Sequence, residues 1–308
     1  LQFYGIYPNA SLTPTSDNHT KNHTIKNIAN TISISCIIIP SLISFNSTIT
    51  DPTTAVEKPY QVISSVDHEL LNRQVGDTIK SIFMQEIPMF NQPEPMYDLV
   101  RVQPAGVKGL ILQHRNLFII KITAEVQKPV SAAQYDAYAK PQTILTVAAP
   151  DARRLETYLS ENRREIQTVS DNAERERTIA AAKKYGEVTL KGQIKETFGI
   201  DMDIPKGYRF RNKINNDFIW ISNEHGVPFQ GLVVYSYPYS GKDDFLPENL
   251  LKRRNEFMSR IPGPSDGSYM ITSEHADPEV RYLRIYDRSW AEMGGLWDVH
   301  GDFMGGPF

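Results

Sequence analysis

Residues 60–83 have the sequence YQVISSVDHELLNRQVGDTIKSIF, and this stretch decides the predicted fold class. Val62 and Val66 fall on one face of a period-2 pattern, which predicts a short β-strand over residues 60–66. Asp67 follows at a position that favours a helix N-cap. Apolar side chains then recur at close to helical spacing, which predicts one helix with an apolar stripe made of Leu70, Leu71, Val75, Ile79, Ile82 and Phe83. A strand followed by an amphipathic helix indicates a sheet covered by helices.

The remainder of the first half continues these two patterns. Residues 151–184 form its longest helical pattern and contain eight basic and seven acidic side chains. This balance favours a solvated, ion-paired surface over a surface for nucleic acid. The polar triplet at residues 170–172 predicts a break that divides the helix in two. Residues 186–205 are expected to connect the two halves, and further strands are predicted at residues 96–102, 117–126 and 142–148.

The second half has its own strands and one clear helix. Pro247 suits a first helical turn, and the Pro-Gly-Pro run at residues 262–264 ends the helix that follows. Strands are predicted at residues 208–214, 218–222, 231–239, 268–272 and 280–286. We therefore predict an α+β fold with two sheet-and-helix halves, residues 56–185 and 186–308. Each half is expected to have a mixed or largely antiparallel sheet with helices packed on one side.

Composition excludes several classes of protein. The 308 residues include 33 Lys and Arg against 36 Asp and Glu, so the net charge of -3 argues against binding of nucleic acid. No apolar stretch reaches the length of about 18 residues that a membrane-spanning helix needs. A single cysteine excludes an internal disulfide and a cysteine-built zinc site. The motifs of Rossmann dehydrogenases, phosphate-binding loops and serine hydrolases are missing, and we predict no cofactor and no resident metal.

The first 55 residues differ from the rest and are predicted to be a poorly ordered leader. Residues 1–50 contain only three charged side chains, and Asn, Thr, Ser and Ile dominate. Lys21 and Lys26 precede an apolar run at residues 32–45, which is the layout of a secretory signal. The alternative is a leader without that role. Cys36 lies in this run and is the candidate lipidation site, although residues 33–35 depart from the small apolar box that usually precedes a lipidated cysteine.

The segment from residue 290 to residue 308 offers the densest group of reactive side chains. In an extended chain Asp298, His300 and Asp302 would point to one side. Two carboxylates beside an imidazole are able to bind a divalent metal or to hold the histidine as a general base. These three residues are the candidate catalytic group of a hydrolase. The alternative is that the aspartates are turn or cap residues beside glycines and that the histidine is exposed.

Aromatic residues supply the candidate ligand-binding surface. Tyr235, Tyr237 and Tyr239 lie on one predicted strand face, where phenol rings stack on ligands or line a pocket. Trp297 offers a further flat apolar face for a ligand. The alternatives are cross-strand packing for the tyrosines and, for the region around Trp297, a compact glycine- and aromatic-rich terminal segment that fills a groove in the core.

Short motifs in a fixed order indicate a family resemblance. They are QPEPMYD (92–98), RNL (115–117), FIWIS (218–222), YSYPY (235–239), RRN (253–255), IPGP (261–264), SYM (268–270), GLW (295–297) and FMGGPF (303–308). With them, the chain from about residue 60 to residue 308 resembles an uncharacterised bacterial envelope family, domain of unknown function 4837. The resemblance implies an exported protein of a Gram-negative envelope, typically lipid-anchored behind a leader peptide, and it implies no reaction. The context of Cys36 departs from that pattern.

We therefore expect a non-enzymatic cell-envelope protein on the periplasmic side, which binds a ligand or an envelope partner. The alternatives are a metal-assisted or general-base hydrolase that uses the C-terminal Asp/His/Asp group, and a purely structural scaffold. Nucleic acid is not an expected partner, and contact with a membrane is expected only through a lipid anchor.

Overall fold

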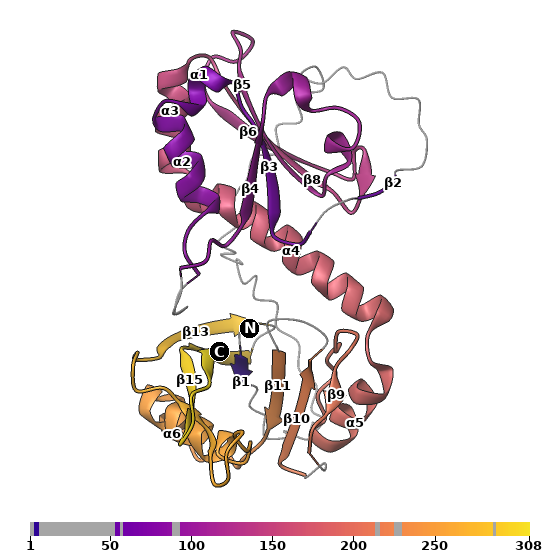
Figure 1. Ribbon diagram of the computed structural model, residues 1–308, viewed down its shortest axis with the longest axis vertical. Helices are drawn as coiled ribbons and strands as arrows, with labels where there is room; N and C mark the ends of the chain where they lie inside the picture. Colours follow the sequence, from indigo (N-terminus) through magenta and orange to yellow (C-terminus); the bar gives the residue numbers. More distant parts are fainter. Residues whose placement is uncertain are drawn as a thin grey trace, which may run out of the picture.

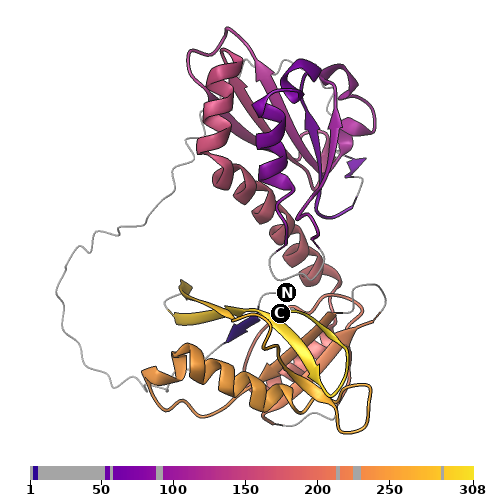
Figure 2. The same ribbon diagram turned by 60° about the vertical axis from the view of Figure 1, so that its left-hand side comes forward.

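The computed structural model describes residues 3–5, 53–55, 58–87, 93–212, 216–224, 230–285 and 288–308. It consists of two sheet-and-helix halves stacked along the long axis of the molecule (Figure 1). The 23-residue helix α4 (Arg163–Tyr185) runs from the upper half toward the lower one, and the turned view shows the same arrangement (Figure 2). The predicted α+β class with two halves is confirmed.

The first half is built on a five-stranded mixed sheet with the order β4-β3-β5-β8-β6. The first four strands in this order are parallel, and the edge strand β6 is antiparallel to β8. Two short strands, β2 (Thr53–Thr54) and β7 (Ala139–Lys140), pair separately. The sheet comprises β3 (Gln61–Ser65), β4 (Asp98–Val102), β5 (Asn116–Ile122), β6 (Val130–Tyr135) and β8 (Thr143–Ala149).

The α-helices of this half cover one face of the sheet. The helices α2 (Gln74–Phe83), α3 (Ala152–Glu161) and α4 place apolar side chains on β3, β5 and β8 in one cluster. The opposite face, around Ile63 and Leu117, is covered by a loop layer that includes the 3-10 turns η1 (Pro104–Gly106) and η2 (Ile111–Gln113). Parallel strands need cover on both faces, which explains why all five residues of β3 are buried.

The predicted helix after β3 is interrupted. It consists of α1 (His68–Leu71) and α2, and the side chain of Asp67 forms no capping hydrogen bond. The carbonyl of Asp67 instead accepts hydrogen bonds from the amides of Leu70 and Leu71. A Cβ atom at Gly76 would lie 2.0 Å from the Leu71 carbonyl oxygen, so glycine permits the tight turn between the two helices.

The predicted break at residues 170–172 is wrong, because α4 is continuous there and the chain breaks at Asn162. Ser170 is buried, and Asp171 accepts a hydrogen bond from the Tyr97 hydroxyl at 2.6 Å. The Asp171 side chain is thus engaged in a tertiary contact and does not compete for the helix backbone. The expected connector at residues 186–205 contains a further helix, α5 (Val188–Phe198), which ends at Gly199 with φ +69°.

The second half contains three antiparallel sheets of three strands each. The first comprises β9 (Arg209–Phe210), β10 (Phe218–Asn223) and β11 (Gln230–Tyr235). The second comprises β12 (Tyr269–Thr272), β15 (Leu296–His300) and β16 (Gly305–Pro307). The third comprises β1 (Phe3–Gly5), β13 (Glu279–Ile285) and β14 (Arg288–Gly294). The strands β14 to β16 lie in the glycine- and aromatic-rich segment for which no strand was predicted.

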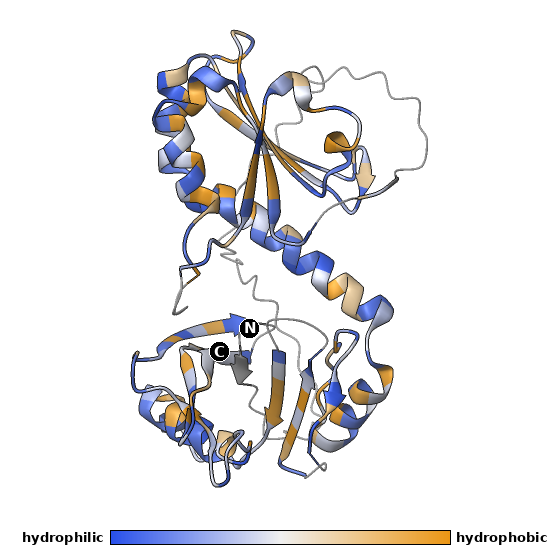
Figure 3. Ribbon diagram, viewed as in Figure 1, coloured by the Kyte–Doolittle hydropathy of each residue, from blue (hydrophilic) through white to orange (hydrophobic). Residues whose placement is uncertain are grey.

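Two helices cover opposite faces of the β9–β10–β11 sheet. Ile219 and Ile221 of β10 pack against α5, whereas Phe218 packs against α6 (Pro247–Met258). Successive side chains of a strand point to opposite faces, so one strand serves both clusters. The prediction that helices pack on one side of each sheet therefore holds for the α-helices of the first half. In the second half helices cover both faces of this sheet, because the helix at residues 188–198 was not predicted. Apolar residues concentrate on the strands, while the middle of α4 is mostly hydrophilic (Figure 3). Within the described residues no helix meets the length and hydrophobicity that crossing a bilayer requires.

Candidate functional site

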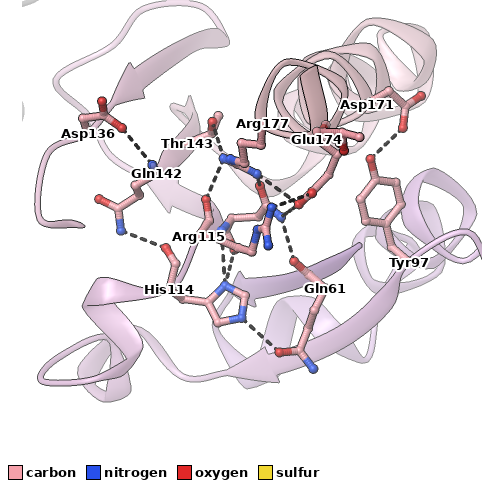
Figure 4. A network of polar contacts seen from close by, with 12 residues as sticks. Gln61, Tyr97, His114, Arg115, Asp136, Gln142, Thr143, Asp171, Glu174 and Arg177 are labelled. Atoms are coloured by element: carbon pink, nitrogen blue, oxygen red, sulfur yellow. Dashed lines mark hydrogen bonds and ion pairs between the residues drawn. The ribbon is translucent and has the colours of Figure 1, made fainter. Parts of the chain in front are cut away.

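Polar side chains gather where three parallel strands of the first half begin. Gln61, Asn116 and Thr143 are the first residues of β3, β5 and β8, so they meet at one edge of the sheet. The helix α4 crosses this edge and directs Glu174 and Arg177 toward it (Figure 4). Parallel pairing in register therefore brings together Gln61 and Thr143, which are 82 positions apart in the sequence.

Glu174 lies at the centre of this network and is 1% exposed. One carboxylate oxygen accepts hydrogen bonds from Asn116 Nδ2 at 2.7 Å and from Arg177 Nη1 at 3.0 Å. The other oxygen accepts from Arg115 Nη2 at 2.8 Å. Arg177 also donates to the Arg115 carbonyl oxygen at 2.9 Å and to Thr143 Oγ1 at 2.8 Å. Burial lowers the pKa of the Arg177 guanidinium, and the attraction of Glu174 opposes this shift. The Glu174–Arg177 pair therefore holds α4 against β5 and β8.

His114 is buried beside this pair. Its Nε2 atom lies 3.0 Å from Gln61 Oε1, and its Nδ1 atom lies 3.0 Å from the Asn116 carbonyl oxygen. Gln142 Nε2 donates to the His114 carbonyl oxygen at 2.8 Å. Both ring nitrogens thus have protein neighbours at hydrogen-bond distance, which indicates a histidine that holds the sheet edge together.

Two tyrosines lie on the other side of Glu174. Burial, together with the hydrogen bond to Asp171, raises the pKa of the Tyr97 phenol. The ring of Tyr60 lies 5.7 Å from that of Tyr97, and Tyr60 is 51% exposed. Tyr60 has φ +57°, a conformation that a bulky residue adopts only under strain. Such strain is concentrated at functional sites in proteins, so the conformation of Tyr60 indicates a functional site at this edge of the sheet.

A groove with a volume of about 470 Å³ opens beside the network. Arg115, Arg177 and Lys206 contribute three positive charges to its walls, and Glu174 contributes one negative charge. Arg115 Nε is buried and lacks a hydrogen-bond partner among the described residues. Apolar walls complete the groove; they are formed by Pro59, Ala181, Ala182, Tyr185 and Pro205.

The structure separates the three candidate catalytic residues. Strand β15 places Asp298 and His300 on one face, as the alternation predicts, but the strand ends at His300. Gly301 turns the chain with φ +83°, and the Asp302 carboxylate accepts a hydrogen bond from the Ser265 hydroxyl. This hydrogen bond lowers the pKa of Asp302. In the part of the chain that the structure describes, no group of three or more His, Cys, Asp or Glu side chains is placed to hold a metal. The hydrolase assignment stays a prediction.

The candidate ligand-binding tyrosines lie against α6. The ring of Tyr235 stacks on Phe257 at 4.3 Å, and that of Tyr237 lies 6.4 Å from Tyr235. Tyr239 is 52% exposed. The predicted strand over residues 231–239 ends at Tyr235, so the expectation that all three tyrosines lie on one strand face is wrong. The rings of Tyr235 and Tyr237 pack against Phe257 of α6, and a role of these tyrosines in ligand binding stays a prediction.

Trp297 lies in a different sheet from Tyr235. Trp297 lies opposite Gly306 in the β15–β16 pair, and a Cβ atom at Gly306 would lie 3.1 Å from the indole nitrogen. The indole therefore packs on the glycine backbone. Cys36, the candidate lipidation site, lies outside the described residues.

Comparison with known families divides the chain in two at the end of α4. Residues 187–308 match the family model described as Domain of unknown function (DUF4837). The second half contains a DUF4837 domain. Residues 55–183 match a second model, Domain of unknown function (DUF8532). The resemblance is thus confirmed for the second half, and the motifs at residues 92–98 and 115–117 lie in the DUF8532 match. No curated protein and no solved structure matches the chain.

The two family matches locate the groove at their boundary. Pro205 and Lys206 belong to the DUF4837 domain, and the other lining residues belong to the DUF8532 match or end α4. Sequence analysis missed this site because its residues are scattered between positions 59 and 206. Two features of the sequence could have indicated the site. A polar residue stands at the start of each buried strand, and Glu174 and Arg177 have helical spacing in the longest helix.

Proposed function

We propose that the chain is a non-enzymatic binding protein of the cell envelope, and that it holds a small anionic ligand in the groove between DUF8532 and DUF4837. The supporting observation is the charge of the groove walls. Glu174 is the one carboxylate among the described residues that line the groove, and both of its oxygens already accept hydrogen bonds from protein donors. Three cations against this one carboxylate leave an excess of two positive charges for a ligand.

The hydrogen-bonding state of the site supports binding of a ligand over a reaction. Arg115 Nε has no acceptor among the described residues, and an unpaired buried donor costs about 1–3 kcal/mol. An oxyanion in the groove would supply an acceptor for Arg115. The nitrogens of His114 and the oxygens of Glu174 are occupied by protein partners, so neither group is poised as a base.

The groove is tested with inorganic phosphate as the probe. Phosphate at constant ionic strength should raise the melting temperature of the full chain in a saturable way. Lys206→Gln removes an exposed cation of the groove that makes no ion pair in the described residues, and it should weaken this effect severalfold. Lys252→Gln, an equal charge change on an exposed residue of α6, is the control and should respond as the parent does. Equal responses of both variants would refute the groove as the site.

The envelope location rests on the predicted leader and on the resemblance to DUF4837. Metabolic labelling with a fatty-acid analogue should modify the parent protein and leave Cys36→Ser unlabelled. The parent should fractionate with membranes, and the variant should not. Unlabelled parent protein in the cytosol would contradict the proposed location.

A further inference from the structure

The DUF4837 domain contains a buried arginine that lacks an acidic partner. Arg254 on α6 is 7% exposed, and no carboxylate among the described residues forms an ion pair with it. Burial lowers the pKa of its guanidinium to about 10. Proteins rarely bury an arginine without a counter-charge, because the lost hydration must be replaced. The neighbouring arginines differ, since Arg253 on α6 pairs with Glu256, and Arg260, which follows the helix, pairs with Asp217.

The few contacts that Arg254 makes fix the orientation of its guanidinium plane. Nη1 donates to Thr272 Oγ1 at 2.5 Å, and Thr272 Oγ1 in turn donates to Asn255 Oδ1 at 2.6 Å. The guanidinium carbon lies 3.6 Å from the centre of the Phe308 ring, which covers one face of the cation. The bond to Thr272 is the one hydrogen bond of the guanidinium to a described residue, and Nε and Nη2 are not among the fully buried, unpartnered nitrogens of the described chain. The open side of Arg254 is therefore an edge of the guanidinium, which is the side that binds a carboxylate with two parallel hydrogen bonds.

Tyr235 lies about one turn of α6 away from Arg254, because its ring stacks on Phe257. The two ring centres are 4.3 Å apart, with an angle of 20° between the ring planes, which fixes the position of the phenol. Burial raises the pKa of the Tyr235 phenol to about 12, so the hydroxyl carries its proton at neutral pH. The hydroxyl makes no hydrogen bond to another described residue.

We propose that Arg254 and Tyr235 bind the carboxylate group of a ligand, at a site separate from the groove at the domain boundary. One unpaired guanidinium matches the single charge of a carboxylate. The neighbouring Arg253 and Arg260 are already ion-paired with described residues, so they are not free to help neutralise a phosphate dianion. The ring of Tyr235 favours a flat apolar group attached to the carboxylate.

Sodium benzoate is the probe, benzyl alcohol is its uncharged counterpart, and inorganic phosphate is the second anion. Titration calorimetry of the full chain should show saturable binding of benzoate, no binding of benzyl alcohol, and weaker binding of phosphate at this site. Arg254→Gln should weaken benzoate binding by at least about tenfold, because it removes the charge-assisted hydrogen bonds. Tyr235→Phe should weaken it severalfold.

Arg260→Gln is the matched control, because Arg260 also lies over a ring, 4.5 Å from the centre of Phe257, but is ion-paired. It should bind benzoate as the parent does, and so should Lys206→Gln. Tyr235→Phe keeps the test decisive if Arg254→Gln fails to fold. Unchanged affinity in both Arg254→Gln and Tyr235→Phe would overturn the proposal, as would the absence of saturable benzoate binding. Loss of benzoate binding in Lys206→Gln would assign the benzoate site to the groove. If the parent bound phosphate more tightly than benzoate, and Arg254→Gln lost that phosphate binding, the assignment of a carboxylate ligand would be overturned.

Discussion

At the scale of single residues, the burial of charge decides which side chains matter. Glu174 accepts hydrogen bonds from Arg177 on its own helix and from Arg115 and Asn116, which are more than 50 positions away in the sequence. A buried ion pair contributes little when compared with an apolar replacement, but the loss of one partner is expensive because the other charge stays behind. The same reasoning makes the unpaired Arg254 notable, since the described residues leave its charge uncompensated.

Glu174→Ala should lower the free energy of unfolding by about 3–5 kcal/mol, because it leaves Arg177 and Arg115 without a counter-charge. Denaturant unfolding of the full chain measures this loss. Glu176→Ala, an exposed position on the same helix, is the control and should change stability by no more than about 0.5 kcal/mol. A similar result for both variants would show that the network does not hold α4 to the sheet.

The titration of Tyr235 provides a test at high pH. Because the folded-state pKa of about 12 lies above the ordinary value of 10.0, the folded protein favours the protonated phenol. The stabilisation is complete below pH 10 and is lost as the pH rises from 10 toward 12. Unfolding measured along this range should show a smaller loss of stability in Tyr235→Phe than in the parent. Identical pH profiles would contradict a buried phenol.

At the scale of elements, contacts between distant segments override local preferences. The triplet at residues 170–172 favours a helix break, yet the contact between Asp171 and Tyr97 keeps α4 continuous. The strands β3, β5 and β8 were predictable from their apolar patterns. The strands β14 to β16 were not, because they are rich in glycine and their partners lie in other segments. The polar residues at the strand starts were visible in the sequence, but their convergence depends on the parallel register.

Two helical glycines should respond in opposite ways to alanine. Gly76→Ala should destabilise the protein by about 1–3 kcal/mol, because its Cβ would lie 2.0 Å from the Leu71 carbonyl oxygen. Gly192 in α5 has nothing within 4 Å of its added Cβ, so Gly192→Ala should stabilise by about 0.5–1 kcal/mol. Denaturant unfolding of both variants measures the difference. Stabilisation by Gly76→Ala would contradict the close α1–α2 turn.

At the scale of the whole molecule, each half has a core of its own. The apolar clusters of the first half draw on residues 62–169, and those of the second half draw on residues 190–270, with no shared member. The family matches divide the chain at the same place, after α4. Two separate cores joined by one helix are expected to unfold as two cooperative units.

Scanning calorimetry of the full chain should therefore resolve two transitions. Glu174→Ala should lower the temperature of one transition, and Gly192→Ala should raise the temperature of the other, because their contacts belong to different cores. A single transition that shifts as a whole in both variants would show that the halves unfold together.

The order of apolar and polar residues was enough to determine that this chain forms an α+β fold in two halves, and motif order was enough to identify DUF4837 in the second. These properties depend on neighbours in the sequence, where periodicity and turn residues act locally. Only the tertiary structure decided that Glu174 meets Arg115, that the groove lies at the domain boundary, and that Arg254 is buried without a carboxylate. Burial and electrostatic pairing depend on what surrounds a side chain in space, and local patterns do not contain that information.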